Sequence, residues 1–180
     1  MRWIFFRPAK DQRTRTLLAR TAVQAVVFWG LALFVVPPLL VRAHRALGIV
    51  TIPAPGQTVG APLLFTLCSV LGLSSAVVMT VQGRGTPLPM ESPRLLVTAG
   101  PYRVVRNPMA VAGIGQGIAV AWWWGSWPVL LYAFVGGVLW HILIRPLEER
   151  DLTARFGAAY EAYRDRVPLW FPRPRALPPA

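Results

Sequence analysis

The stretch "NPMAVAGIGQGIAVAWWWGSWPVLLYAFVGGVLWHILI", residues 107–144, contains no Asp, Glu, Lys or Arg. One helix of this length would be roughly 57 Å long, nearly twice the hydrocarbon thickness of a bilayer. The segment "GSWP" at Gly125–Pro128 supplies a glycine and a proline that break helices. The stretch therefore predicts two antiparallel membrane helices that are joined by a tight turn.

Two other uncharged stretches, Thr21–Val41 and Ala61–Val81, are each long enough to cross a bilayer. The loop "GIVTIPAPGQTVG" between them is rich in residues that end helices. The sequence thus predicts an all-α, polytopic membrane protein with about four transmembrane helices, of which the last two form a helical hairpin. A cytosolic C-terminal helix is expected to follow the hairpin.

The bulk composition also indicates a membrane protein. A net charge of +12 is typical of nucleic-acid binding, but 54% of the residues are hydrophobic and only 14% are charged. We therefore expect membrane lipids as partners and no nucleic acid. Cys68 is the single cysteine and the only histidines are His44 and His141, so neither a disulfide framework nor a metal site is expected.

The distribution of basic residues predicts the orientation. With four spans and the N-terminus inside, 17 of the 19 Lys and Arg residues would face the cytoplasm. Both termini are therefore expected in the cytoplasm, with the chain integral to a bacterial plasma membrane. The N-terminal stretch also permits a signal peptide with a weak cleavage site at Val41–Ala43, but its apolar part is long for one. Trp3, Phe5 and Phe6 are more typical of an anchor at the membrane interface.

Chemically reactive side chains are concentrated after the last span. Five of the seven acidic residues lie between Glu148 and Asp165. On a helix, His141, Arg145 and Glu148 share one stripe, with Glu149 beside it. Asp151 and Arg155 have the spacing of a helical ion pair. Charges near lipid depth are costly, so Arg145 and Glu148 are expected to line a polar cavity.

A second group of polar residues precedes the hairpin, in "GPYRVVRNPM" (100–109). Asn107 followed by Pro108 is typical of a helix start, with an N-cap and then proline at the first helical position. Arg103 and Arg106 beside such a helix start favour an anion site. We expect the loop 83–107 and the helix after the hairpin to enclose a pocket on the cytoplasmic side.

Two blocks of the sequence are similar to a known superfamily. "LLVTAGPYRVVRNPM" (95–109) and "EERDLTARFGAAYEAYRDRVP" (148–168) resemble the isoprenylcysteine carboxyl methyltransferase and phospholipid methyltransferase superfamily. The resemblance covers about the last 90 residues. The chain departs from the family pattern at two positions: Asn107 replaces the usual histidine, and Ala110 replaces a frequent aromatic residue.

The resemblance implies an integral membrane methyltransferase that uses S-adenosylmethionine and takes a lipophilic substrate from the bilayer. We expect one membrane domain over 1–180: the uncharged stretches indicate an anchor and two spans in 1–82, and the resemblance implies a methyltransferase core in 83–175. By position, Arg145 lies close to the family's substrate arginine. The cofactor-binding residues it implies are Leu95, Leu96, Val97, Tyr102, Asn107, Pro108, Met109 and Glu148.

The acceptor group decides which side chains must act. A carboxylate needs no base, and Arg145 would orient it as a fork. A protonated amine needs a base, for which Glu149 is the nearest candidate. Since Asn107 cannot titrate, the sequence favours an isoprenylcysteine-like carboxylate over a phospholipid amine. A non-catalytic binding or assembly protein with this fold, and a relative of the NADPH-dependent membrane sterol reductases, stay open as alternatives. The sequence determines neither the acceptor's identity nor the oligomeric state.

Overall fold

The computed structural model describes residues 8–51, 54–87 and 91–172. Over these ranges the regular elements are helices joined by loops, and the one β-type contact is an isolated bridge between Pro8 and Ser92. The all-α fold class predicted from the sequence is confirmed. The anchor predicted at residues 3–6 and the end of the predicted core, 173–175, fall outside the described residues.

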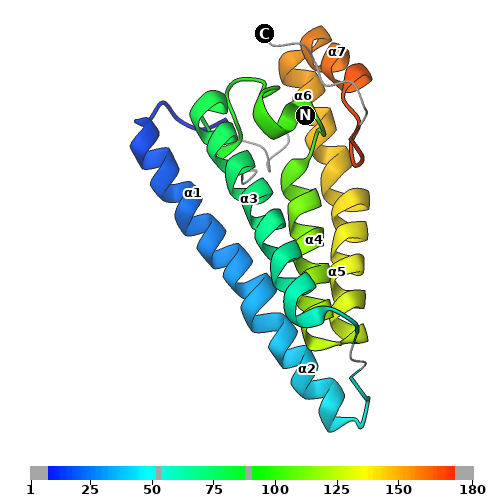
Figure 1. Ribbon diagram of the computed structural model, residues 1–180. Helices are drawn as coiled ribbons and strands as arrows, with labels where there is room; N and C mark the ends of the chain where they lie inside the picture. Colours follow the sequence, from blue (N-terminus) through cyan, green and yellow to red (C-terminus); the bar gives the residue numbers. More distant parts are fainter. Residues whose placement is uncertain (1–7, 52–53, 88–90, 173–180) are drawn as a thin grey trace.

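The helices form a bundle of long antiparallel rods with two short helices at one end (Figure 1). The first rod runs without interruption through three segments, and the last rod continues from the membrane hairpin into the short helices. In chain order the elements are α1 (Thr14–Trp29), η1 (Gly30–Val35), α2 (Val36–Ala46), α3 (Gln57–Gly83), η3 (Gly100–Arg103), α4 (Pro108–Trp124), α5 (Trp127–Leu139), η4 (Trp140–Ile144), α6 (Arg145–Phe156) and α7 (Ala158–Arg166).

Three helical stretches among the described residues are long and apolar enough to cross a membrane: Thr14–Ala46, Gln57–Gly83 and Trp127–Phe156. The first two contain the spans predicted at 21–41 and 61–81. Helix α4 has 17 residues, which gives a length of about 26 Å, slightly less than the hydrocarbon core. The structure thus supports a polytopic membrane protein, while the total of four spans stays a prediction.

Both π-helical segments end two positions before a proline. Segment η1 ends just before Pro37 and Pro38, and η4 ends just before Pro146. Proline lacks an N–H and its ring collides with the carbonyl four residues earlier, so a regular α-helix is disturbed there. A wider π turn accommodates that disturbance without ending the helix, and each rod stays continuous.

The hairpin forms as the sequence predicts. The Asn107 side chain accepts a hydrogen bond from the Ala110 amide at 3.0 Å and caps α4, with Pro108 in its first turn. Gly125 ends α4 with φ 56°, a left-handed conformation that favours glycine. Ser126 then caps α5 by accepting from the Val129 amide at 3.4 Å.

Small residues let the rods approach closely. A Cβ added at Gly113 would collide with the Trp29 ring, and one at Gly115 would collide with the Cys68 sulfur. Helix α4 therefore approaches the end of α1 and the middle of α3 through glycines, as is common where lipid supplies no hydrophobic drive between helices.

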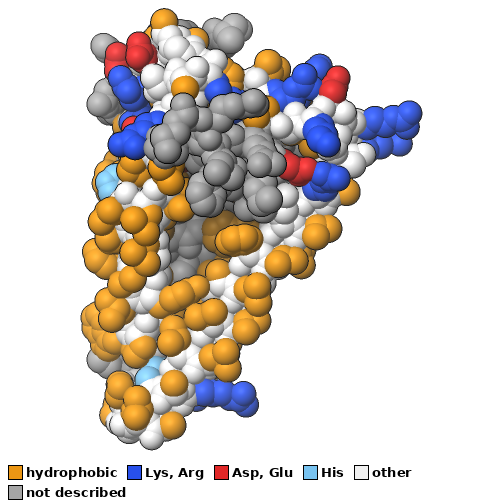
Figure 2. Space-filling model, turned by 180° about the vertical axis from the view of Figure 1, so that it is seen from behind, with side chains coloured by type: hydrophobic (Ala, Val, Ile, Leu, Met, Phe, Trp, Pro, Cys, Tyr) orange, Lys and Arg blue, Asp and Glu red, His pale blue; other side chains and the backbone are white. Residues whose placement is uncertain are grey.

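The character of the surface changes along the bundle axis. Apolar side chains cover the body of the rods, and charged side chains gather at one end, with a basic group at the other (Figure 2). Val26, Phe34 and Phe134 are 73%, 64% and 66% exposed, which is expected of side chains that contact lipid. The start of α1, the loop after α3 and helices α6 and α7 all lie at the charged end (Figure 1).

Candidate active site

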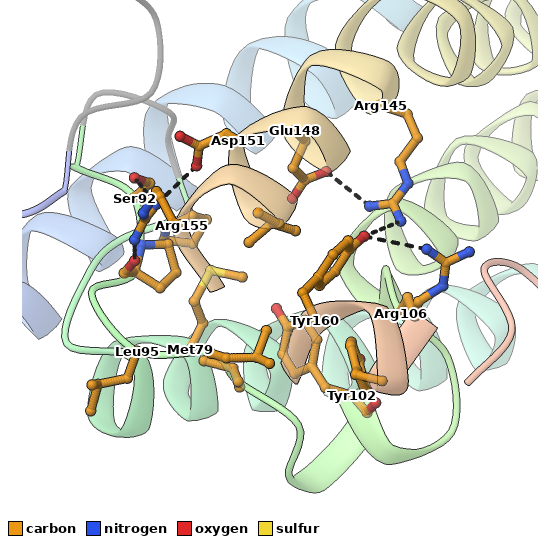
Figure 3. A pocket seen from close by; sticks show the side chains of 16 residues that line it. Met79, Ser92, Leu95, Tyr102, Arg106, Arg145, Glu148, Asp151, Arg155 and Tyr160 are labelled. Atoms are coloured by element: carbon orange, nitrogen blue, oxygen red, sulfur yellow. Dashed lines mark hydrogen bonds and ion pairs between the residues drawn. The ribbon is translucent and has the colours of Figure 1, made fainter. Parts of the chain in front are cut away.

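A cavity of about 70 Å³ lies at the charged end, between the loop after α3 and helices α6 and α7. Met79, on the last turns of α3, supplies the bundle side of its wall. Figure 3 shows side chains from the loop and from both short helices pointing toward this shared space. Loop and C-terminal helices thus enclose one pocket, although tens of residues separate them in sequence.

The loop contributes an apolar wall made of Leu95, Leu96 and Val97. Its path is fixed by the end of α3, where the Gly83 carbonyl accepts hydrogen bonds from the amides of Arg94 at 2.6 Å and Leu95 at 3.1 Å. A side chain at Gly83 would collide with Val97, so the glycine permits the loop to close on the helix. A flat apolar group, such as a purine, would find a matching surface here.

Tyr102 lies on the short helix η3 and is 5% exposed. The Tyr163 hydroxyl donates to its backbone carbonyl at 2.7 Å, which holds η3 against α7. Burial raises the pKa of Tyr102 well above its ordinary value of 10.0, and the nearby Glu148 raises it further. The Tyr102 hydroxyl is buried and has no hydrogen-bond partner within the described part of the chain. A buried polar group of this kind is suited to bind a ligand.

Two arginines and two glutamates form the polar wall. Arg145 is 3% exposed, and its guanidinium donates to Glu148 at 3.3 Å, to Glu149, and to the Tyr160 hydroxyl at 3.3 Å. Its Nε is buried and unpartnered among the described residues, so the side chain keeps one donor for a ligand. The cluster consists of Arg106, Arg145, Glu148 and Glu149, and its formal charges sum to zero.

Arg106 joins the cluster from the loop before α4. Its guanidinium donates to Glu149, to the Tyr160 hydroxyl at 3.3 Å and to the Val167 carbonyl at 2.9 Å. Its backbone amide donates to the Pro168 carbonyl at 2.8 Å. The motif before α4 is thereby fastened to the segment after α7. The Arg106 side chain also lines the cavity.

Six of the ten residues that the sequence assigns to catalysis or cofactor binding line the cavity: Leu95, Leu96, Val97, Tyr102, Arg145 and Glu148. The remaining four, Asn107, Pro108, Met109 and Glu149, are not among the lining residues. Asn107 lies behind the wall, where its Nδ2 is 3.5 Å from Glu148 while its oxygen caps α4. Glu149 faces the two guanidinium groups, which use its carboxylate as a shared acceptor.

His141, which the helical stripe grouped with Arg145, does not reach the cavity. Its ring centroid lies 5.6 Å from that of Trp170, and the side chain is exposed. The residue belongs to the π-helical segment η4, where a turn holds more than 3.6 residues. Positions calculated for an α-helix are therefore displaced there.

Several lining residues were not identified from the sequence as pocket residues: Met79, Ser92, Asp151, Arg155, Tyr160 and Tyr163. The ion pair of Asp151 with Arg155 is confirmed, at 2.9 Å, but its position in the pocket wall was not expected. The i, i+3 spacing of Tyr160 and Tyr163 places both rings on one helix face, a signal that could have indicated them.

The groups that line the cavity fit a cofactor that combines a heterocycle, hydroxyl groups and positive charge. The apolar wall suits the heterocycle, and the carboxylates of Glu148 and Asp151 face the same space (Figure 3). Carboxylates accept from hydroxyl and ammonium groups and stabilise a nearby cation. The unpartnered Tyr102 hydroxyl adds a neutral donor.

Comparisons with known proteins identify the family of the chain. Residues 57–159, more than half of the chain, match the family model for Phospholipid methyltransferase. The chain is also 28% identical over 178 residues to Methanethiol S-methyltransferase 2 of Bradyrhizobium diazoefficiens. That alignment covers 95% of this chain and 63% of the relative, so the chain spans less than two thirds of that protein's length. The chain belongs to the phospholipid methyltransferase family and is an integral membrane protein.

Proposed function

For this member of the phospholipid methyltransferase family, we propose that the cavity binds S-adenosylmethionine and that the protein methylates the carboxylate of a lipophilic molecule. The observation that carries the proposal is Arg145, a buried guanidinium on the cavity wall with its Nε unpartnered among the described residues. An acceptor that is already an anion needs orientation and no base. Arginine binds such an anion with directional hydrogen bonds.

S-adenosylmethionine, when bound, supplies a methyl group on a positively charged sulfur. The chain's own residues would bind and orient the reactants. Leu95, Leu96 and Val97 would contact the adenine, and Tyr102 would donate a hydrogen bond from its neutral hydroxyl. The Glu148 carboxylate would stabilise the positive end, and Asn107, Pro108 and Met109 would meet the cofactor at the start of α4.

Arg145 would hold the acceptor carboxylate. The cofactor would supply the methyl group of the new O–CH3 bond, and its sulfur would keep the electron pair of the S–CH3 bond and become neutral. No proton moves in this step. Glu149 is then a positioning residue, because its carboxylate already accepts from Arg106, Arg145 and Tyr160. A protonated phospholipid amine would need Glu149 as its base. Because the Glu149 carboxylate is already engaged, this acceptor is disfavoured.

A thiol is the second candidate acceptor, favoured by the similarity to Methanethiol S-methyltransferase 2. A thiol that has released its proton to water is also an anion when it attacks, so the same guanidinium would stabilise it. In both cases the acceptor would come from the bilayer or its surface. The end of the bundle that holds the pocket, the start of α1 and the C-terminal helices would face the cytoplasmic side of a bacterial plasma membrane.

The first test is binding of S-adenosylmethionine to the purified protein in detergent, measured by calorimetry, with Glu148→Ala as control. Binding that Glu148→Ala weakens by tenfold or more is expected, about 1.4 kcal/mol. Absence of binding by the unchanged protein would refute the proposal and leave a non-catalytic binding or assembly role.

The second test is turnover with three acceptors: an isoprenylated cysteine carboxylate, methanethiol and phosphatidylethanolamine. Arg145→Ala should reduce turnover about 100-fold or more while cofactor binding stays within about threefold. Turnover of phosphatidylethanolamine alone, or an Arg145→Ala variant with unchanged turnover, would show the acceptor assignment to be wrong.

A further inference from the structure

Arg155, in the last turn of α6, makes an unusual set of contacts. It donates to the Ser92 hydroxyl at 2.9 Å, to Asp151 at 2.9 Å and to the Pro93 carbonyl. Figure 3 draws its guanidinium between Asp151 and Ser92, at the edge of the cavity opposite Arg145. The three acceptors come from two elements, so the side chain joins α6 to the loop.

Ser92 and Pro93 lead directly into the apolar wall at Leu95–Val97. On the other side, this part of the loop is held by the Ala9 amide, which donates to the Ser92 carbonyl at 3.1 Å. Arg94 and Asp11 also form an ion pair, but their side chains are 38% and 82% exposed. Solvent and salt screen this pair, so it contributes little to holding the loop.

The side chains of Arg155 and Asp151 are only 17% and 12% exposed, which reduces screening of their interactions. Charged donors also make shorter and stronger hydrogen bonds than neutral ones. Arg155 therefore provides a strong and well-shielded polar link between this part of the loop and α6.

We propose that Arg155 is a positioning residue that holds the apolar wall against α6 and so controls how firmly the pocket retains its cofactor. This inference rests on the proposed cofactor site. Asp151 neutralises the guanidinium and directs it toward the loop. Arginine is suited to the task because its planar group presents donors in several directions, whereas the lysine ammonium is a compact point charge.

The variant Arg155→Met tests the link. Methionine keeps an unbranched stem near the Phe156 ring, over which the guanidinium now lies at 4.9 Å, but loses every hydrogen bond. The dissociation rate of S-adenosylmethionine should rise about tenfold, and its KM should rise with it, while kcat stays within about twofold. Arg155→Lys should recover part of the loss. Arg164→Met, a matched change at a 40% exposed side chain on α7, should have no effect.

A second measurement does not need cofactor. The amides of Arg94 and Leu95 donate to the Gly83 carbonyl, so their hydrogen exchange reports whether the loop stays on the end of α3. In cofactor-free protein, exchange at both amides should be about tenfold faster in Arg155→Met than in the unchanged chain or in Arg164→Met.

Each outcome decides the proposal. Unchanged exchange in Arg155→Met would show that the residue does not hold the wall. Faster exchange with an unchanged cofactor dissociation rate would show that the link does not serve the cofactor. If the unchanged protein binds no S-adenosylmethionine, the proposed function fails by itself, and the exchange comparison still tests the link.

Discussion

Glu149→Gln isolates the electrostatic balance of the polar cluster. The Glu149 carboxylate is the shared acceptor of Arg106 and Arg145, whose side chains are only 13% and 4% exposed. The change keeps the size of the side chain but gives the cluster a net charge of +1. Breaking a fully buried pair costs roughly 3–5 kcal/mol. Because Glu149 itself is 30% exposed, we expect about 2–3 kcal/mol.

For a chain of this size, that loss lowers the melting temperature by about 5–10 °C. Unfolding can be followed by the fluorescence of the 8 tryptophans, in one detergent and at one scan rate. Glu161→Gln, the same chemical change at an exposed position on α7, is the matched control and should move the melting temperature by about 1 °C or less.

A double-mutant cycle then tests the reasoning. Arg106→Gln alone leaves the cluster at −1 and should also destabilise the protein. The double variant restores neutrality, so its loss should be smaller than the sum of the single losses by about 1 kcal/mol or more. Additivity within about 0.5 kcal/mol would refute the idea that charge balance holds this cluster together.

Two further predictions concern stability. Ser126→Ala should cost about 1–2 kcal/mol, because the hydroxyl caps α5 and also bonds to the buried His44 ring at 3.1 Å; Ser126→Thr should cost less than half of that in the same thermal assay. Burial raises the pKa values of Tyr102, Tyr160 and Tyr163. Above pH about 10 the unfolded chain therefore releases phenolic protons that the folded chain retains, and stability should fall as the pH rises. Tyr102→Phe should flatten this decline, and a melting temperature that is constant from pH 9 to 11 would contradict it.

Local features of the sequence determine the rods. The 107–144 stretch has no charge, so its length and the "GSWP" turn suffice to place the hairpin. The cap at Asn107 and the ion pair between Asp151 and Arg155 depend on residues three or four positions apart, where helical geometry alone fixes the contact. Similarity to a known superfamily pointed to the cavity residues Leu95–Val97 and Tyr102, whereas Glu148 was also indicated by the helical stripe that it shares with Arg145.

Only the tertiary structure decided how the site is assembled. Arg106 meets Glu149 and Tyr160 across 43 and 54 positions of the chain, and Arg155 meets Ser92 across 63. No period of a helix relates such residues; they meet because the loop after α3 folds back onto the charged end of the last rod. The sequence thus specifies each rod through local hydrogen bonding and the thickness of the bilayer. The packing of rods and loop determines which charges neutralise one another, since buried ionic groups are stable only with partners.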